Sequence, residues 1–168
     1  EDEVAALMTL LRSYLLSGFK KAAKNNVRIR IIGDKTYLAP DIQQAIAELE
    51  ADSEKNTGLQ FQIAINYGGR DEVVRAVKKV AKRFAEEGKS MEELTMEDIG
   101  GALDTADIPD PDLIIRTSGE QRLSNFLMWQ SAYAELYFTD VLWPDFDKKD
   151  LDKALSEFKS RKRRFGGV

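Results

Sequence analysis

The spacing of hydrophobic residues along the chain alternates between two periods. Apolar residues recur every three or four positions, and therefore predict amphipathic helices, over residues 4–19, 42–49, 73–84 and 151–158. Short β-branched or alternating runs predict strands over residues 27–32, 59–65 and 113–115. Repeated alternation of strand and helix indicates a three-layer α/β domain, in which helices flank a mostly parallel central sheet.

Polar residues and a proline mark where these helices begin. Pro40 suits the first turn of the second helix, because proline fixes a helical φ and needs no hydrogen-bond partner there. Thr95 and Asp98 have the spacing of a capping box, which predicts a short helix over residues 95–103. Asp147 can cap the last helix in the same way.

Length and charge limit the kind of protein. The 168 residues are the size of one domain and contain no repeat or linker, so we expect a single domain over residues 1–168. The net charge of −4, from 25 basic and 29 acidic residues, argues against a nucleic-acid partner. No run reaches the ~18 apolar residues that a membrane-spanning helix needs, and no signal peptide is visible.

Cysteine and histidine are both absent. Their absence excludes a disulfide framework and a thiol nucleophile, and it removes the commonest general base and metal ligand. Any chemistry must therefore use carboxylates, arginines, hydroxyls, amides or a bound ion. A chain without cysteine also fits a reducing compartment, so we expect a cytoplasmic location.

The loop that follows the strand over residues 113–115 holds the strongest candidate site. Ligands of open α/β sheets bind outside the carboxyl ends of the strands. This loop offers two arginines, two hydroxyls and a glycine, which suit a phosphate or diphosphate: Arg116, Ser118, Gly119, Arg122 and Ser124. The alternative is a surface loop in which Arg116 and Arg122 pair with Glu120 and Asp112.

Two further features each allow a structural and a functional interpretation. The Gly68–Gly69 pair lies between a strand and a helix, where it could cradle a phosphate or simply allow a tight turn. Glu135 lies among aromatic residues, where a buried carboxylate needs a partner. That partner could be an arginine or a Mg²⁺ ion, since hard cations prefer oxygen ligands.

Two charged segments are better explained without a ligand. Asp107, Asp110 and Asp112 are separated by prolines, so we interpret them as a solvated loop rather than a metal site. The basic run over residues 161–164 suits the C-terminal end of a helix, where cations complement the dipole.

Several of these stretches together resemble one known family. They are IAINYGGR over residues 63–70, DLIIRTSGEQRLSNFLMWQ over 112–130, YAE over 133–135 and WPDF over 143–146. With these motifs the whole chain closely resembles the cis-prenyltransferases, most closely the bacterial undecaprenyl diphosphate synthases. The second stretch is long and unusual, and it carries most of the specificity.

The resemblance implies an enzyme that condenses isopentenyl diphosphate with an allylic diphosphate such as farnesyl diphosphate. The product would be a long-chain polyprenyl diphosphate, here the undecaprenyl diphosphate that serves cell-wall lipid carrier synthesis. Mg²⁺ would assist departure of the allylic diphosphate, and the growing chain would enter an apolar tunnel. The chain has no paired-aspartate DDxxD motif, which is consistent with the cis class.

The resemblance also implies roles for individual residues. Arg116, Arg122 and Ser124 match the residues that bind isopentenyl diphosphate, and Leu123 lies in the same substrate-binding run. Glu135 matches a Mg²⁺ ligand near a dimer interface.

More distant positions match too. Arg164 and Gly166 match an element that reaches a phosphate site in the partner subunit of a homodimer. Leu59 matches a position on the tunnel wall where bulk helps set product length. A peripheral membrane contact for product release would accompany these roles.

One part of the family pattern is missing. The sequence contains neither the Asp-Gly-Asn phosphate loop with its essential aspartate nor the following Ser/Thr-Glu-Asn-Trp run. We therefore expect a C-terminal portion of the catalytic domain, with no catalytic residue of its own and inactive alone. The alternatives are a non-catalytic partner subunit of a cis-prenyltransferase or a generic phosphate-ester-binding α/β domain.

Overall fold

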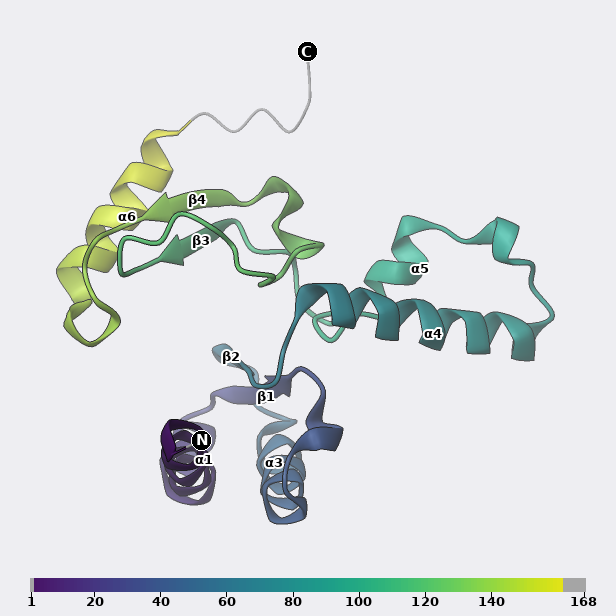
Figure 1. The fold of residues 1–168 in the computed structure, drawn as a ribbon, viewed down its shortest axis with the longest axis horizontal. Helices are drawn as coiled ribbons and strands as arrows, with labels where there is room; N and C mark the ends of the chain where they lie inside the picture. Colours follow the sequence, from purple (N-terminus) through teal and green to yellow (C-terminus); the bar gives the residue numbers. More distant parts are fainter. Residues whose placement is uncertain (1, 162–168) are drawn as a thin grey trace. The chain divides into compact units, whose positions relative to one another are not determined.

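The computed structural model describes residues 2–161 of the chain (Figure 1). It describes their side chains except those of residues 2–5, 16, 18 and 20. Contacts divide the chain into two compact units, Glu1–Tyr67 and Gly68–Val168. Each unit combines helices with a pair of parallel strands, so the predicted α/β class with parallel strands is confirmed. None of the described helices is long and apolar enough to cross a membrane.

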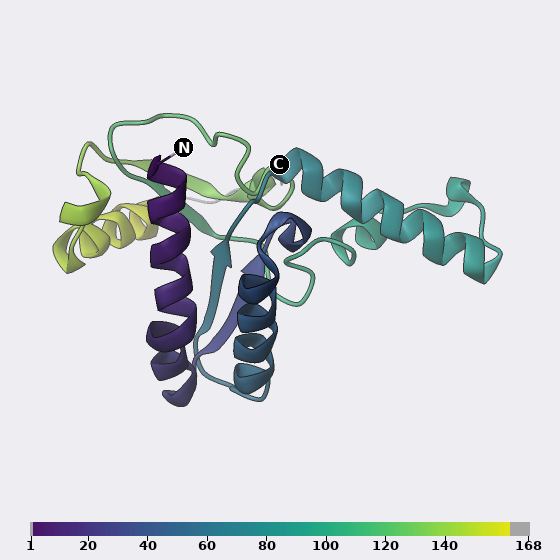
Figure 2. The same ribbon diagram turned by 60° about the horizontal axis from the view of Figure 1, so that its bottom comes forward.

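The first unit is a layer of helices against two strands. Helix α1 (Asp2–Ser13) continues through a π-helical turn, Tyr14–Gly18, into α2 (Phe19–Lys24). Strand β1 (Arg28–Ile32) leads to the 3₁₀ turn Lys35–Tyr37, helix α3 (Pro40–Ser53) and strand β2 (Gln60–Ala64). Helices α1 and α3 lie side by side along the β1–β2 pair (Figures 1 and 2).

Burial of one helix face and one strand face holds this unit together. Strands β1 and β2 are parallel, with Arg28 opposite Gln60. Pro40 begins α3 as predicted, and Ile42, Ala45, Ile46 and Leu49 on its apolar face are buried. The buried cluster consists of Leu15, Ala23, Ile29, Ile31, Leu38, Ile42, Ala45, Ile46 and Leu49.

The second unit begins with the long helix α4 (Gly69–Glu87) and ends with helix α6 (Lys148–Ser160). Between them lie the 3₁₀ turn Met91–Glu93, the short helix α5 (Met96–Gly100), strand β3 (Leu113–Arg116), the 3₁₀ turn Gln130–Tyr133, strand β4 (Glu135–Phe138) and the 3₁₀ turn Trp143–Asp145. Strands β3 and β4 are parallel, with Leu113 opposite Glu135. A second buried cluster contains Ala76, Val80, Phe84, Ile99 and Leu103.

The predicted helix starts are confirmed, whereas some predicted faces are wrong. Thr95 caps α5 in a capping box with Asp98, and Asp147 caps α6. Helix α5, however, ends at Gly100 instead of reaching residue 103. A Gly-Gly pair follows the first turn there, and glycine destabilises a helix because it loses the most backbone freedom.

The apolar faces of α4 and α6 differ from their sequence patterns. In α4 the buried residues include Glu72 and Ala76, while Val74 and Val77 are exposed. In α6 only Ala154 is buried among the described residues, and Leu151 and Leu155 remain about 40% exposed. Periodicity identifies an amphipathic helix, but the neighbouring elements decide which stripe is covered.

Candidate diphosphate-binding site

The candidate loop leaves strand β3 in a fixed conformation. After Arg116, the backbone N–H groups of Ser118 and Gly119 donate to the carbonyl oxygens of Val141 and Thr139, each over 2.9 Å. Ser118 and Gly119 have positive φ angles of 67° and 71°. Two successive left-handed residues form a tight turn directly after strand β3.

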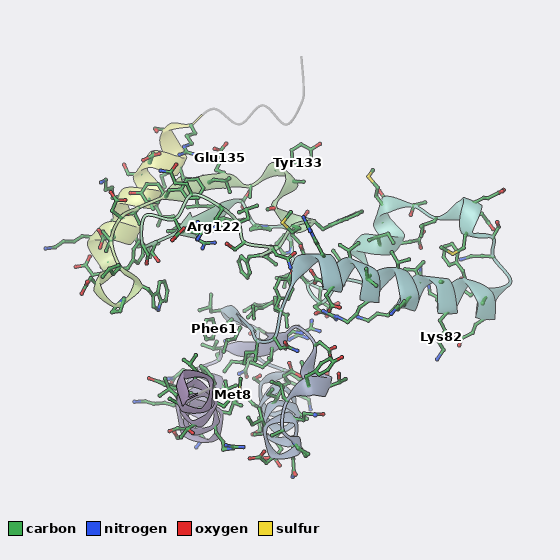
Figure 3. The ribbon with its side chains drawn as sticks, viewed as in Figure 1. Met8, Phe61, Lys82, Arg122, Tyr133 and Glu135 are labelled. Atoms are coloured by element: carbon green, nitrogen blue, oxygen red, sulfur yellow. The ribbon has the colours of Figure 1, made fainter. Side chains whose placement is uncertain are left out.

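Arg122 lies on the loop that follows strand β3 (Figure 3), and Arg116 contacts its backbone. Arg116 Nη1 donates to the carbonyl oxygen of Arg122 over 2.7 Å and closes the turn between them. Arg122 forms an ion pair with Glu120, as the alternative interpretation predicts, and its side chain is 64% exposed. An exposed ion pair of this kind contributes only about 0.2–1 kcal/mol, so a multiply charged anion could replace Glu120.

A cavity of about 550 Å³ opens beside this turn. It is lined by Arg70, Leu123, Ser124, Asn125 and Met128. Leu123 and Ser124, two of the predicted substrate-binding residues, therefore border the same open space. Arg116 and Arg122 do not line it, but the turn that they close leads directly into it.

The Gly68–Gly69 turn supports this loop instead of cradling a phosphate. The backbone N–H of Gly69 donates to the carbonyl oxygen of Asn125 over 2.7 Å. The N–H of Arg70 donates to Asn125 Oδ1 over 2.9 Å. The two N–H groups are thus already paired, which favours the tight-turn interpretation of the glycine pair.

A second attachment of the loop involves buried charge. Glu72 is buried on α4, and its Oε2 accepts from Gln130 Nε2 over 3.0 Å. Its Oε1 accepts from the backbone N–H of Asp104 over 2.9 Å, and Gln130 also donates to Thr105 Oγ1. Hydrogen bonds to both oxygens offset the cost of burying this carboxylate.

Glu135 has the arginine partner that the sequence allowed. Its Oε2 accepts from Arg161 Nη1 over 2.8 Å, and Arg161 also pairs with Glu157. The hydrogen bond to Glu135, followed by that to Glu157, raises the pKa of Arg161, which stays cationic.

The chemistry of this carboxylate fits a Mg²⁺ ion only in part. One carboxylate can supply one ligand to an ion that usually also takes water and substrate phosphates. The described residues contain no group of three or more acidic side chains that could hold a metal without substrate. The three aspartates of the loop before β3 therefore form no such cluster in the part of the chain that the structure describes.

Two residues of this site were not singled out as site residues from the sequence. Arg70 belongs to the matched Gly-Gly-Arg motif, and the structure places it on the cavity. Asn125 belongs to the matched Ser-Asn-Phe run, and its role depends on a contact with a residue 55 positions away. Only membership of the motifs could have indicated them.

The remaining predicted positions are Leu59 of the first unit and two residues near the C-terminus. Leu59 is 69% exposed in the first unit, next to strand β2. The ring of Phe61 on β2 lies 6.2 Å from that of Phe19, which lies 5.8 Å from that of Tyr14. Arg164 and Gly166 lie outside the described residues.

Solved structures of similar fold are prenyl diphosphate synthases. Lavandulyl diphosphate synthase from Lavandula x intermedia, solved with dimethylallyl diphosphate, matches with a TM-score of 0.92 at 36% identity, over 99% of this chain and 72% of its own. A probable undecaprenyl diphosphate synthase from Campylobacter jejuni matches with a TM-score of 0.86 at 38% identity, over 99% and 76%. The fold is therefore that of this class of enzymes.

The sequence comparisons narrow the class to a family. The model of the family described as "Putative undecaprenyl diphosphate synthase" matches residues 1–166. An isoprenyl transferase from Rhizobium meliloti is 48% identical over 168 residues. A farnesyl-diphosphate-specific undecaprenyl diphosphate synthase from Vibrio vulnificus is 47% identical over 166 residues. The chain belongs to the undecaprenyl diphosphate synthase family.

The chain corresponds to part of these relatives. The match to the Rhizobium meliloti protein includes all of this chain and 68% of the length of that protein. The chain spans 66% of the Vibrio vulnificus protein and 65% of an isoprenyl transferase from Brucella suis. The chain thus spans about two thirds of the length of the curated relatives it matches.

Proposed function

We propose that this chain carries the isopentenyl diphosphate half of a cis-prenyltransferase that elongates an allylic diphosphate to a polyprenyl diphosphate. Family membership over residues 1–166 supports the reaction class. The observation that carries the proposal is the cavity beside Ser124, which adjoins the turn closed by Arg116 and Arg122. A diphosphate concentrates negative charge on several oxygens, and arginine forks and hydroxyls recognise that pattern.

Each loop residue has a defined part in this proposal. Arg122 exchanges its ion pair with Glu120 for the diphosphate, and Ser124 donates its hydroxyl from the cavity wall. Arg116 keeps the turn closed with one N–H and has four further donors for phosphate oxygens. Leu123 supplies an apolar contact for the isopentenyl group.

Glu135 is the proposed Mg²⁺ ligand. When bound, Mg²⁺ neutralises diphosphate charge and so helps the allylic diphosphate to leave. Glu135 would have to release the oxygen that now accepts from Arg161. Arg161 has a second partner in Glu157, so it would not become an unpaired cation.

The apolar product requires an apolar surface of comparable length. Leu59 and Phe61 are exposed large hydrophobic residues, and Phe61 continues an aromatic series through Phe19 to Tyr14. We propose that this surface of the first unit forms part of the wall of the hydrophobic tunnel, with Leu59 influencing product length. A surface of large apolar side chains suits a hydrocarbon ligand.

The assembly that we propose is a cytoplasmic homodimer with peripheral membrane contact for product release. In this proposal, residues 1–168 are one part of the catalytic domain of each subunit. Arg164 and Gly166 act at the phosphate site of the partner subunit. Since the chain carries no Asp-Gly-Asn run, the allylic substrate would not be ionised, and the 168-residue chain alone would not turn over.

The experiment measures binding, because this chain is proposed to bind without turning over. Isopentenyl diphosphate is titrated by calorimetry into the 168-residue chain in the presence of Mg²⁺, and into Arg116→Ala. Loss of a charge-assisted contact costs on the order of 1.5–3 kcal/mol, about a 10- to 150-fold rise in Kd. No binding by the unsubstituted chain would refute the proposal, and so would robust product formation from farnesyl diphosphate by the chain alone.

A further inference from the structure

The N-terminus of helix α4 is capped by a residue from a distant part of the chain. A helix leaves its first N–H groups without partners inside the helix. Gly68 precedes α4 and has no side chain to accept from them. Asn125 accepts instead, with its carbonyl oxygen from Gly69 and with its Oδ1 from Arg70. We call this contact between residues 68–70 and 125–128 the 69–125 junction.

The glycine pair is what allows the junction to be so close. A Cβ atom on Gly68 would lie 2.8 Å from Asn125 Nδ2. A Cβ atom on Gly69 would lie 2.9 Å from the backbone nitrogen of Met128. The first neighbour is the end of a side chain and could turn away, whereas the second is backbone. Any side chain at position 69 would therefore displace the loop.

The loop segment at the junction has a backbone that needs support. Ser124, Asn125 and Leu127 have positive φ angles of 48°, 65° and 46°. Residues other than glycine rarely adopt this left-handed conformation, and a leucine does so least readily of the three. Such residues keep this conformation only where surrounding contacts hold them. The junction supplies two hydrogen bonds at the centre of this segment.

We infer that the 69–125 junction is a positioning element of the diphosphate site, and that Gly69 and Asn125 are its positioning residues. The inference rests on the proposed function of the loop. Asn125 follows Ser124 directly, so fixing Asn125 fixes the point from which the Ser124 hydroxyl and the Arg122 turn project. The junction also pairs two N–H groups of α4, so the diphosphate is bound by the side chains of the loop and not by these N–H groups.

Replacing Gly69 with alanine tests the position of the loop without weakening helix α4. Alanine has a higher helix propensity than glycine, so α4 itself has no reason to weaken. The added Cβ nevertheless pushes the backbone of Met128 away. For Gly69→Ala we expect the Kd for isopentenyl diphosphate to rise about tenfold. Gly100→Ala is the matched control, because that glycine is also helical and has no atom within 4 Å of its Cβ position.

Asn125→Gly tests the same junction from the other side. Glycine accepts the positive φ of Asn125 without strain, so the junction loses only the hydrogen bond that Oδ1 accepts from the Arg70 N–H, and the cavity loses one amide from its wall. We expect the Kd for isopentenyl diphosphate to rise several-fold, which corresponds to the loss of one capping hydrogen bond of typical strength. We also expect faster hydrogen exchange at the Arg70 amide. Asn26→Gly is its control, since Asn26 also has a positive φ of 62° and its Oδ1 accepts from the N–H of Thr57 over 2.9 Å.

The outcomes distinguish the inference from the proposed function. Weaker binding by Gly69→Ala and Asn125→Gly, with wild-type binding by both controls, supports the inference. If the unsubstituted chain binds isopentenyl diphosphate and Asn125→Gly binds equally well despite faster exchange at Arg70, the inference is overturned and the proposed function stands. If the unsubstituted chain does not bind at all, both are overturned. Circular dichroism checks folding, and Asn125→Gly decides the question if Gly69→Ala does not fold.

Discussion

Replacing Arg122 with alanine tests how the diphosphate competes with an existing ion pair. Arg122 is largely exposed, and its guanidinium pairs with Glu120 within the same turn. Its carbonyl oxygen accepts from Arg116, and this backbone contact does not depend on the Arg122 side chain. Arg122→Ala should therefore remove one ligand of the diphosphate while leaving the turn closed.

The expected loss of affinity is the difference between two contacts. A charge-assisted hydrogen bond to the diphosphate contributes about 1.5–3 kcal/mol. Binding first breaks the pair with Glu120, which costs about 0.5 kcal/mol for an exposed pair. The net loss is then about 1–2.5 kcal/mol, which corresponds to a rise in Kd of about 5- to 70-fold.

Isothermal titration of isopentenyl diphosphate into the folded chain measures this change. Arg122→Lys keeps the charge without the planar fork, so its Kd should lie between those of the unsubstituted chain and Arg122→Ala. Lys82→Ala is the control, because it removes an exposed cation that pairs with Glu86 on α4, away from the loop. A Kd for Arg122→Ala within twofold of that of Lys82→Ala would show that Arg122 does not bind the diphosphate.

Three further predictions concern the surroundings of the site. Arg70→Ala should weaken binding of isopentenyl diphosphate several-fold and reduce its dependence on salt, because Arg70 lines the cavity; equal salt slopes would contradict this. Arg161→Ala should strengthen Mg²⁺ binding in the presence of pyrophosphate by about two- to fivefold, because it frees Glu135; unchanged calorimetric binding would argue against Glu135 as a ligand. Thr95→Ala should destabilise the chain to urea by about 1 kcal/mol at pH 7. One part of this stabilisation needs the ionised Asp98, because the hydrogen bond from Thr95 Oγ1 is the chief cause that lowers the pKa of Asp98. That part is present above the ordinary pKa of about 3.9 and fades as the pH falls through the lowered value, so an equal effect at pH 3 would refute it.

Local signals in the sequence predicted most of the elements. Strands were predicted close to their observed bounds, Arg28–Ile32, Gln60–Ala64 and Leu113–Arg116. The caps Thr95 and Asp147 were also correct. These features depend on residues within a few positions of each other, and neighbouring residues are visible in a linear sequence.

Strand β4 and the buried faces were not predictable in the same way. Strand β4 (Glu135–Phe138) has no clear alternation, and it is a strand because it pairs with β3. The valines of α4 predict an apolar face that the structure leaves partly exposed. Glu72 of the same helix is buried, because Gln130 and the Asp104 backbone amide donate hydrogen bonds to it. Burial is decided by what packs against a helix, and the pattern within the helix cannot specify that.

The sequence by itself determined the family, the parallel α/β class and the basic, hydroxyl-bearing loop, because each of these is encoded in contiguous residues. Only the tertiary structure decided how that loop is held. It brought Asn125 onto the start of α4, across 56 residues from Gly69, and it joined Arg161 to Glu135. Such contacts form between segments that meet only after folding, when the backbone N–H groups and charges removed from water must find partners wherever the chain places them.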